Sequence, residues 1–236
     1  MDATRRTAFV AGLFYLITFA ASIPAVFLLA PVLNHADYIV SAGADTRVLW
    51  GCFLDLVNAL ACIGTAVALF PVVKRQNEAV ALGFVTSRML EAAIILIGVV
   101  SLLAVVTLRQ DLAGAPGTDM ASLVTAGRAL VAVRDWTFLL GPSLMPGLNA
   151  LLLGWLLYRS GLVPRLIPAL GLIGAPLLIA SATAALFRGN DPITVLAAIA
   201  TVPIFLWELS LGIWLVVKGF KPSPITTGMA EPNVAA

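Results

Sequence analysis

Long apolar runs dominate the chain, and short polar segments separate them. A helix needs about 20 mostly apolar residues to cross a lipid bilayer. Six stretches meet this requirement, approximately residues 7–33, 48–73, 80–108, 137–158, 162–187 and 193–217. Most connections between them are short, so we expect helices adjacent in sequence to pack as antiparallel neighbours. The pattern predicts an all-α polytopic membrane protein with six transmembrane helices in a single bundle.

Two longer polar segments and the C-terminal end interrupt this pattern. Residues 34–47 predict a polar loop, and 109–136 contain a turn-rich Gly-Ala-Pro-Gly at 114–117. After Asp119, apolar residues recur at helical spacing, which predicts an amphipathic helix lying at the membrane interface and running into the fourth span. We therefore expect one transmembrane domain over residues 1–220. The proline-rich residues 221–236 predict a disordered cytoplasmic tail.

Lysine and arginine side chains predict the orientation in the membrane. With the N-terminus inside, eight of them lie on the inner side and five are spread over the longer outer loops. Because cytoplasmic loops carry the excess of Lys and Arg, we expect both termini in the cytoplasm. A cleaved signal peptide is the alternative for the first span, since Arg5 and Arg6 precede it. Its apolar run is longer than a typical signal core, which favours a retained helix.

Composition supports a membrane protein and narrows its function. The chain has 61% hydrophobic and 11% charged residues, whereas an ordinary soluble domain has about 25% charged residues. A net charge of +2 leaves no basic excess to bind a nucleic acid. The expected partners are membrane lipids and a small solute, and protein partners stay open. His35 is the single histidine, so we predict no metal site, no cofactor and no catalytic residue, and favour a non-enzymatic protein.

Charged residues inside the predicted spans are the main candidates for function: Asp55, Arg88, Glu91 and Glu208. A charged side chain in the hydrocarbon costs about 2.5–3.5 kcal/mol on insertion scales, so its retention suggests a role. Arg88 and Glu91 are three residues apart, on one helix face. Glu208 lies at a similar depth in the sixth span and meets them if these helices pack. The three residues form either a ligand or proton site, or a clamp that only holds helices together.

The second span carries a polar stripe, which adds Asn58 to the candidate ligand or proton site residues. The stripe consists of Asp55, Asn58, Cys62 and Thr65 at spacings of three, four and three, on one helix face. Asp55 is near the outer end, where Arg134 or Arg128 could reach it. The alternative is ordinary helix packing with one interfacial ion pair. If the stripe faces the Arg88 group, it extends a polar path to the outer face.

The fourth span contains two prolines four residues apart, each beside a glycine. Pro142 and Pro146 remove backbone donors and predict a kink. Such a kink either serves a binding site, as in transporters with broken helices, or only helps packing. Asn149 on the same helix could join a polar interior.

Several segments together resemble a known family. They are Ala-Gly-Leu-Phe-Tyr-Leu-Ile-Thr-Phe at 11–19, Asp-Leu-Val-Asn-Ala-Leu-Ala at 55–61, Ala-Leu-Phe-Pro-Val-Val-Lys at 68–74, Ser-Arg-Met-Leu-Glu-Ala at 87–92, Leu-Leu-Tyr-Arg-Ser-Gly-Leu-Val-Pro-Arg at 156–165 and Trp-Glu-Leu-Ser-Leu-Gly-Ile-Trp-Leu-Val-Val-Lys-Gly-Phe at 207–220. Over residues 5–221, roughly, the chain resembles the bacterial membrane family called domain of unknown function 4386. The resemblance implies a six-helix fold and a bacterial inner-membrane location, and it assigns no activity. Its Arg-x-x-Glu and its later glutamate match Arg88, Glu91 and Glu208.

Three hypotheses on function stay open from the sequence. The first is a non-enzymatic membrane protein whose polar site around Arg88, Glu91 and Glu208 binds or moves a small solute, a lipid headgroup or a proton. The second is a structural or partner-binding subunit in which the charges only clamp helices. The third is an intramembrane enzyme that acts on lipid with a carboxylate as general base.

Overall fold

The computed structural model describes residues 2–35, 37–41, 43–187 and 195–226. Its long helices are α1 (Ala3–Asn34), α2 (Asp45–Val73), α3 (Glu78–Leu112), α4 (Met120–Phe138), α5 (Met145–Ser160), α6 (Leu166–Phe187) and α7 (Val195–Val217). Shorter segments are the 3-10 turns η1 (Tyr38–Val40) and η3 (Pro224–Thr226) and the π-helical η2 (Leu139–Leu144). The described residues contain no strand, and six helices are long and apolar enough to cross a membrane. The predicted all-α fold class is confirmed.

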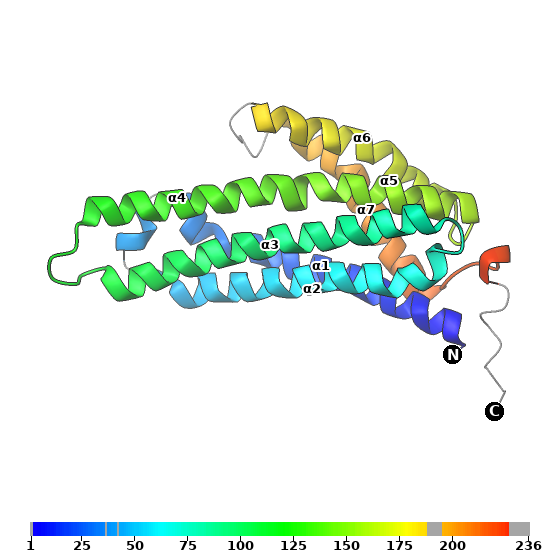
Figure 1. The fold of residues 1–236 in the computed structure, drawn as a ribbon, viewed down its shortest axis with the longest axis horizontal. Helices are drawn as coiled ribbons and strands as arrows, with labels where there is room; N and C mark the ends of the chain where they lie inside the picture. Colours follow the sequence, from blue (N-terminus) through cyan, green and yellow to red (C-terminus); the bar gives the residue numbers. More distant parts are fainter. Residues whose placement is uncertain (1, 36, 42, 188–194, 227–236) are drawn as a thin grey trace.

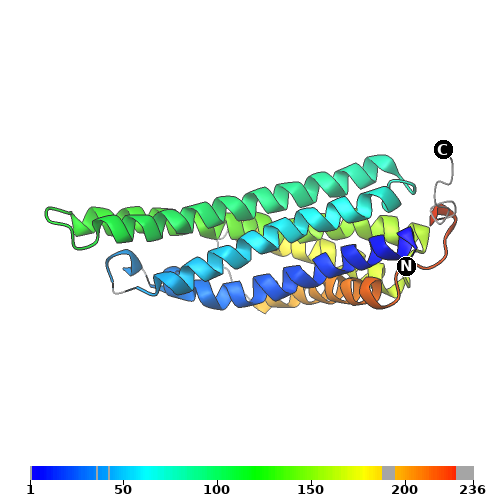
Figure 2. The ribbon, with the colours of Figure 1, turned by 90° about the horizontal axis from the view of Figure 1, so that it is seen from below.

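The membrane-spanning helices form a ring in the order of the chain. Each packs against the next, α3 meets α5 after the α4 hairpin, and α7 closes the ring against α1. Figures 1 and 2 show that α1 begins and α7 ends at the same end of the bundle, which we call the terminal end. The opposite end, where α3 turns into α4, is called the hairpin end.

Helix α4 differs from the predicted interface helix. It runs antiparallel to α3 and continues through η2 into α5 as one long rod (Figure 1). Its buried face includes Leu123 and Gly127, and a Cβ added at Gly127 would lie 3.1 Å from the side chain of Ile39. Because α3 and η1 cover this apolar face, α4 has no need to bury it among lipid headgroups. The prediction that it runs into the fourth span was right, and its placement at the interface was wrong.

Apolar side chains cover the outside of the ring. Phe27, Val67 and Val100 are 66%, 63% and 65% exposed. Such exposure suits a surface whose solvent is lipid hydrocarbon rather than water, and backbone polar groups are satisfied within each helix. Helix α3 alone has 35 residues and is about 50 Å long. It therefore exceeds the roughly 30 Å of a bilayer core and extends beyond it.

The start of the predicted disordered tail is ordered. The backbone N–H of Lys221 donates to the carbonyl of Leu162 at 2.7 Å, and Ser223 Oγ donates to the carbonyl of Ser160 at 2.8 Å. These carbonyls lie at the end of α5 and just after it, where carbonyl groups lack partners within the helix. The prediction of disorder was therefore wrong for residues 221–226, and the remainder, 227–236, lies outside the described residues.

Candidate functional site

Six side chains from five helices meet inside the ring, nearer its terminal end than its hairpin end, since Arg88 is ten residues from the start of the 35-residue α3. We call this group the central cluster. Its members are Tyr15 of α1, Cys62 of α2, Arg88 and Glu91 of α3, Asn149 of α5 and Glu208 of α7. Helix α6 contributes packing instead: a Cβ added at Gly171 would lie 2.8 Å from the ring of Trp207, the neighbour of Glu208.

The guanidinium of Arg88 is the centre of this cluster. Its Nη1 donates to Glu91 Oε2 at 2.9 Å, and its Nη2 donates to Glu208 Oε1 at 2.7 Å. Nη1 also lies 3.7 Å from Cys62 Sγ, and Cζ is 5.1 Å from the centroid of the Tyr15 ring. The predicted contact between Arg88 and a glutamate is confirmed, and both glutamates take part.

Asn149 makes a second hydrogen bond to Glu91. Its Nδ2 donates to Glu91 Oε2 at 2.7 Å. The residue follows the π-helical segment η2, where the backbone packs tightly against α3: a Cβ added at Gly141 would lie 3.0 Å from the side chain of Ile94. The predicted kink is thus a π-helical segment in a continuous rod, and it coincides with close approach of the fourth span to Glu91.

The sequence candidates did not include all members of the cluster. Tyr15 and Cys62 were absent from the candidate set, and Asn149 was noted only as able to join a polar interior. Each stands on the buried stripe of an otherwise apolar helix. That pattern was a usable signal, although it does not reveal which neighbour the side chain meets.

Burial and charge make the cluster unusual. Arg88 is 1% exposed and Glu91 is 4% exposed, while the side chain of Glu208 retains 14% exposure. If all three are ionised, one positive charge faces two negative charges. Of the described residues, no second cation forms an ion pair there. Arg88 Nε, Asn149 Oδ1 and the nearby Ser87 Oγ are buried without a hydrogen-bond partner in the described structure. A buried polar group without a partner is costly and suggests that water or a ligand serves it.

A second buried ion pair lies nearer the hairpin end. Arg134 Nη2 donates to Asp55 Oδ2 at 3.2 Å, and the Arg134 Cζ is 4.9 Å from the centroid of the Phe138 ring. A Cβ added at Gly98 would lie 2.9 Å from Arg134 Cδ, so this glycine of α3 leaves room for the arginine to reach α2. The structure therefore pairs Asp55 with Arg134, one of the two cations that the sequence left open.

Asn58, the remaining candidate, lies on α2 between the two ion pairs. It is 8% exposed and makes no side-chain hydrogen bond within the described part of the chain. Asp55, Asn58 and Cys62 are all buried. Because Cys62 contacts Arg88, the stripe reaches the central cluster, as the sequence allowed.

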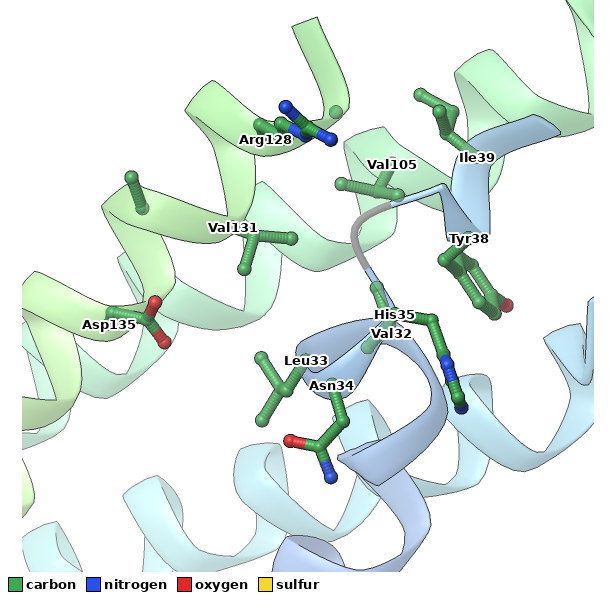
Figure 3. A pocket seen from close by; sticks show the side chains of 12 residues that line it. Val32, Leu33, Asn34, His35, Tyr38, Ile39, Val105, Arg128, Val131 and Asp135 are labelled. Atoms are coloured by element: carbon green, nitrogen blue, oxygen red, sulfur yellow. The ribbon is translucent and has the colours of Figure 1, made fainter. Parts of the chain in front are cut away.

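A pocket of about 250 Å³ lies at the hairpin end, between the end of α1, η1 and α4 (Figure 3). Arg128 and Asp135 of α4 and His35 line it, together with apolar residues such as Val32 and Val105. None of the central cluster residues lines this pocket. Arg128, the other cation considered for Asp55, lies here instead.

Polar contacts order the loop beside this pocket. Arg109 pairs with Asp45 and also donates to the carbonyl of Ser41, and the Tyr38 hydroxyl donates to Asp45 Oδ1 at 2.8 Å. Burial, reinforced by the hydrogen bond to Asp45, raises the pKa of Tyr38 above its ordinary value. These contacts fasten η1 to the start of α2 and the end of α3.

The arrangement limits the chemistry that the site can support. The described residues contain no group of three or more His, Cys, Asp or Glu side chains that could hold a metal ion. What the central cluster offers is two carboxylates, one fixed cation and an amide, enclosed by helices. Such a set can hold and release a proton without moving its heavy atoms far.

Comparison with protein families matches residues 10–219 to the family described as Domain of unknown function (DUF4386). The chain belongs to this family. The match covers every residue of the central cluster, from Tyr15 to Glu208, and it carries no assigned activity. No curated protein and no solved structure matches the chain. Family and helices together establish an integral membrane protein with six apolar helices.

Proposed function

We propose that this protein is a non-enzymatic membrane protein that binds and exchanges a proton at the central cluster. The observation that carries the proposal is that two carboxylates share one guanidinium inside the helix ring: Arg88 contacts Glu91 at 2.9 Å and Glu208 at 2.7 Å. An isolated buried ion costs several kcal/mol even after the protein relaxes. One guanidinium compensates one carboxylate, so a proton is the simplest way to neutralise the second.

The side chains that face the pair from each surrounding helix leave the second carboxylate uncompensated. Among the described residues, the side chains that donate hydrogen bonds to the two carboxylates are Arg88 and Asn149. Tyr15 presents its ring to Arg88, and Cys62 presents its sulfur. Neither adds a positive charge.

Glu208 is the better candidate for the protonated carboxyl. Glu91 accepts hydrogen bonds from both Arg88 and Asn149, whereas Glu208 accepts one, from Arg88. The Glu208 side chain is also more exposed than that of Glu91, 14% against 5%. The carboxylate with fewer donors and an open edge is the one that a proton reaches and leaves most readily.

The charge of the cluster disfavours the other ligands that the sequence allowed. A lipid phosphate or an anionic solute would place a further negative charge beside two carboxyl groups that share one cation. The second candidate function is a structural clamp, favoured by the contacts that Arg88 of α3 makes to helices α1, α2 and α7. A clamp needs no proton exchange, so the two functions are separable by experiment.

Infrared spectroscopy of the purified protein in lipid nanodiscs tests the proposal. A protonated carboxyl absorbs separately from a carboxylate, and we expect wild type to show a carboxylic acid band that disappears reversibly as the pH is raised. Glu208→Gln should remove this band. The matched control is Glu78→Gln, which changes an exposed glutamate at the start of α3 and should leave the band unchanged.

The proposal fails if wild type shows no acid band that responds to pH, or if the band survives replacement of both Glu208 and Glu91. A band that responds to sodium concentration and not to pH would assign the site to a metal cation and would also refute it. We further propose that the protein resides in a bacterial inner membrane with both termini in the cytoplasm, as the Lys and Arg distribution and the family resemblance suggest.

A further inference from the structure

We propose that the central cluster exchanges its proton with the hairpin end of the bundle alone, along the polar face of α2, with the Asp55–Arg134 pair at the entrance. This inference rests on the proposed proton site and adds the direction of access. Three observations carry it: the polar stripe on α2, the uneven distribution of buried polar groups, and the apolar packing of the terminal half.

The stripe joins the two ion pairs. Asp55 and Cys62 are seven residues apart on one face of α2, which separates them by about 10 Å along the helix axis. Asn58 lies between them, buried and without a hydrogen-bond partner in the described structure. At one end Asp55 meets Arg134, and at the other Cys62 meets Arg88. Bridging water molecules hydrogen-bonded to these groups can span such gaps.

Buried polar side chains are concentrated on one side of the cluster. Among the described residues, the buried polar side chains that lie about one helical turn or more from the cluster along their helix are all toward the hairpin end. They are Asp55, Asn58, Ser101, Arg134 and Ser181. Three of these come from helices other than α2, so polar groups of several helices line the hairpin half of the interior. Buried water needs two to four polar partners, and this half provides several of them, whereas on the terminal side the buried polar atom without a partner in the described structure is Trp214 Nε1.

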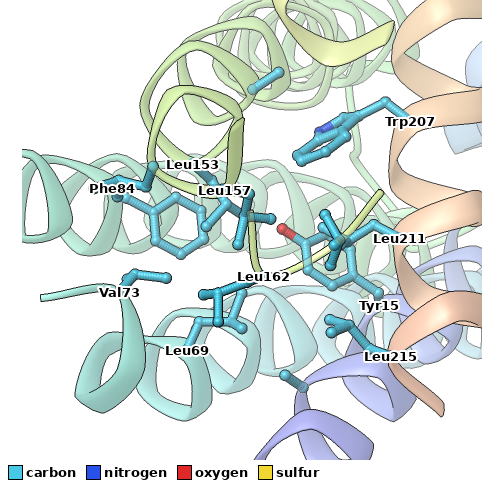
Figure 4. Packing of buried hydrophobic residues seen from close by; sticks show 14 of the residues in the cluster. Tyr15, Leu69, Val73, Phe84, Leu153, Leu157, Leu162, Trp207, Leu211 and Leu215 are labelled. Atoms are coloured by element: carbon cyan, nitrogen blue, oxygen red, sulfur yellow. The ribbon is translucent and has the colours of Figure 1, made fainter. Parts of the chain in front are cut away.

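The terminal half of the interior is packed with apolar side chains (Figure 4). On α2 the buried residues beyond Thr65 are all apolar, from Ala66 to Val73. Side chains of α3, α5 and α7 fill the space opposite them, and Figure 4 shows Phe84, Leu157 and Leu211 among them. An apolar region packed to this degree stays dry. It therefore separates the cluster from the terminal end.

The Asp55–Arg134 pair suits an entrance. Its atoms are 3.2 Å apart, whereas Arg88 and Glu208 are 2.7 Å apart, although the Glu208 side chain is the more exposed, at 14% against 10% and 8% for the outer pair. The outer pair is thus the looser of the two and lies nearer the end from which water arrives. In the closed state the pair carries no net charge, because one arginine faces one aspartate. Opening the pair exposes the Asp55 carboxylate.

Thiol accessibility tests the direction of access. In a Cys52→Ala/Cys62→Ala background, single cysteines are placed by Asn58→Cys and, as the matched control, by Leu69→Cys. Both positions are buried on α2. Leu69 is four residues from the terminal end of the helix and Asn58 is thirteen from the hairpin end, about 6 Å and about 20 Å. Depth alone would favour labelling at Leu69.

We expect the opposite ranking. A cationic, membrane-impermeant methanethiosulfonate should label Asn58→Cys roughly ten-fold faster than Leu69→Cys, a ratio that corresponds to about 1.4 kcal/mol in opening free energy. The reagent should act only from the membrane side that holds the hairpin end, which whole cells and inside-out vesicles distinguish. Equal or faster labelling of Leu69→Cys, or labelling of Asn58→Cys from the terminal side, would overturn the inference.

Proton-release kinetics provide a second measurement on intact protein. After a pH jump, we expect Asp55→Asn/Arg134→Gln to slow proton release from the cluster roughly ten-fold, with the number of protons unchanged. Asp45→Asn, which changes another ion pair at the hairpin end, should leave the rate unchanged. An unchanged rate in the double variant refutes the entrance. If wild type itself shows no exchanging proton at the cluster, the proposed function is refuted instead of the entrance.

Discussion

Replacing Arg88 by alanine is expected to destabilise the bundle more than the loss of any exposed cation. The substitution removes the partner of both Glu91 and Glu208 from a site in which Arg88 is 1% exposed. Breaking a buried ion pair by removing one partner typically costs 3–5 kcal/mol, because the other charge stays buried. Loss of the stacking with Tyr15 acts in the same direction. We expect a decrease of about 3–5 kcal/mol in the free energy of unfolding.

Removing all the charges together should have a much smaller effect. Arg88→Met, Glu91→Leu and Glu208→Leu replace the ions by apolar groups, and such replacement is often neutral or stabilising by about 1–4 kcal/mol. Asn149 would then lose the acceptor of its Nδ2 donor, a loss of about 1–3 kcal/mol. Adding Asn149→Leu removes that donor too. The fourfold variant should fold, and it should exchange no proton at the cluster.

The assay is equilibrium unfolding in mixed micelles with increasing dodecyl sulfate, followed by tryptophan fluorescence. Trp207 is 1% exposed and sits next to Glu208, so its emission reports on packing at the site. Arg128→Ala is the control, since this exposed arginine forms no ion pair within the described residues. It should change the free energy by no more than about 0.5 kcal/mol. If Arg88→Ala and Arg128→Ala unfold alike, the cluster is not buried and the argument built on it is wrong.

Three further predictions concern the helix contacts and the topology. Arg5→Ala should lower the unfolding free energy by about 1–2 kcal/mol, because this guanidinium donates to the carbonyls of the last three residues of α7. Arg6 is the exposed neighbour, and Arg6→Ala should have little effect in the same assay. Gly12→Ala should lower the unfolding free energy by about 1–3 kcal/mol, because the new Cβ would lie 2.7 Å from a backbone oxygen of α7. Gly83→Ala is the control, since the nearest atom to its Cβ is 3.5 Å away and stability should be retained. Reporter fusions at Gly114 and at the C-terminus should lie on opposite sides of the membrane, and finding both on one side would refute the predicted topology.

Local sequence pattern was sufficient to predict the helices, the Arg88–Glu91 pair and the polar stripe of α2. The length of the apolar runs predicted the helices, since a bilayer requires about 20 apolar residues per span. The pair of Arg88 and Glu91 was predictable because residues three apart on a helix are neighbours whatever the tertiary structure. The stripe from Asp55 to Cys62 was predictable for the same reason.

The tertiary structure decided every contact that depends on how a helix is rotated about its axis. The meeting of Arg88 with Glu208, 120 residues later, required α3 and α7 to face each other across the ring. The choice of Arg134 over Arg128 depended on the space left by Gly98. Within a membrane, apolar surface toward lipid and apolar surface toward protein look alike in sequence. Close packing at small residues and buried polar contacts therefore set the rotation of each helix, and neither is visible until the neighbours are in place.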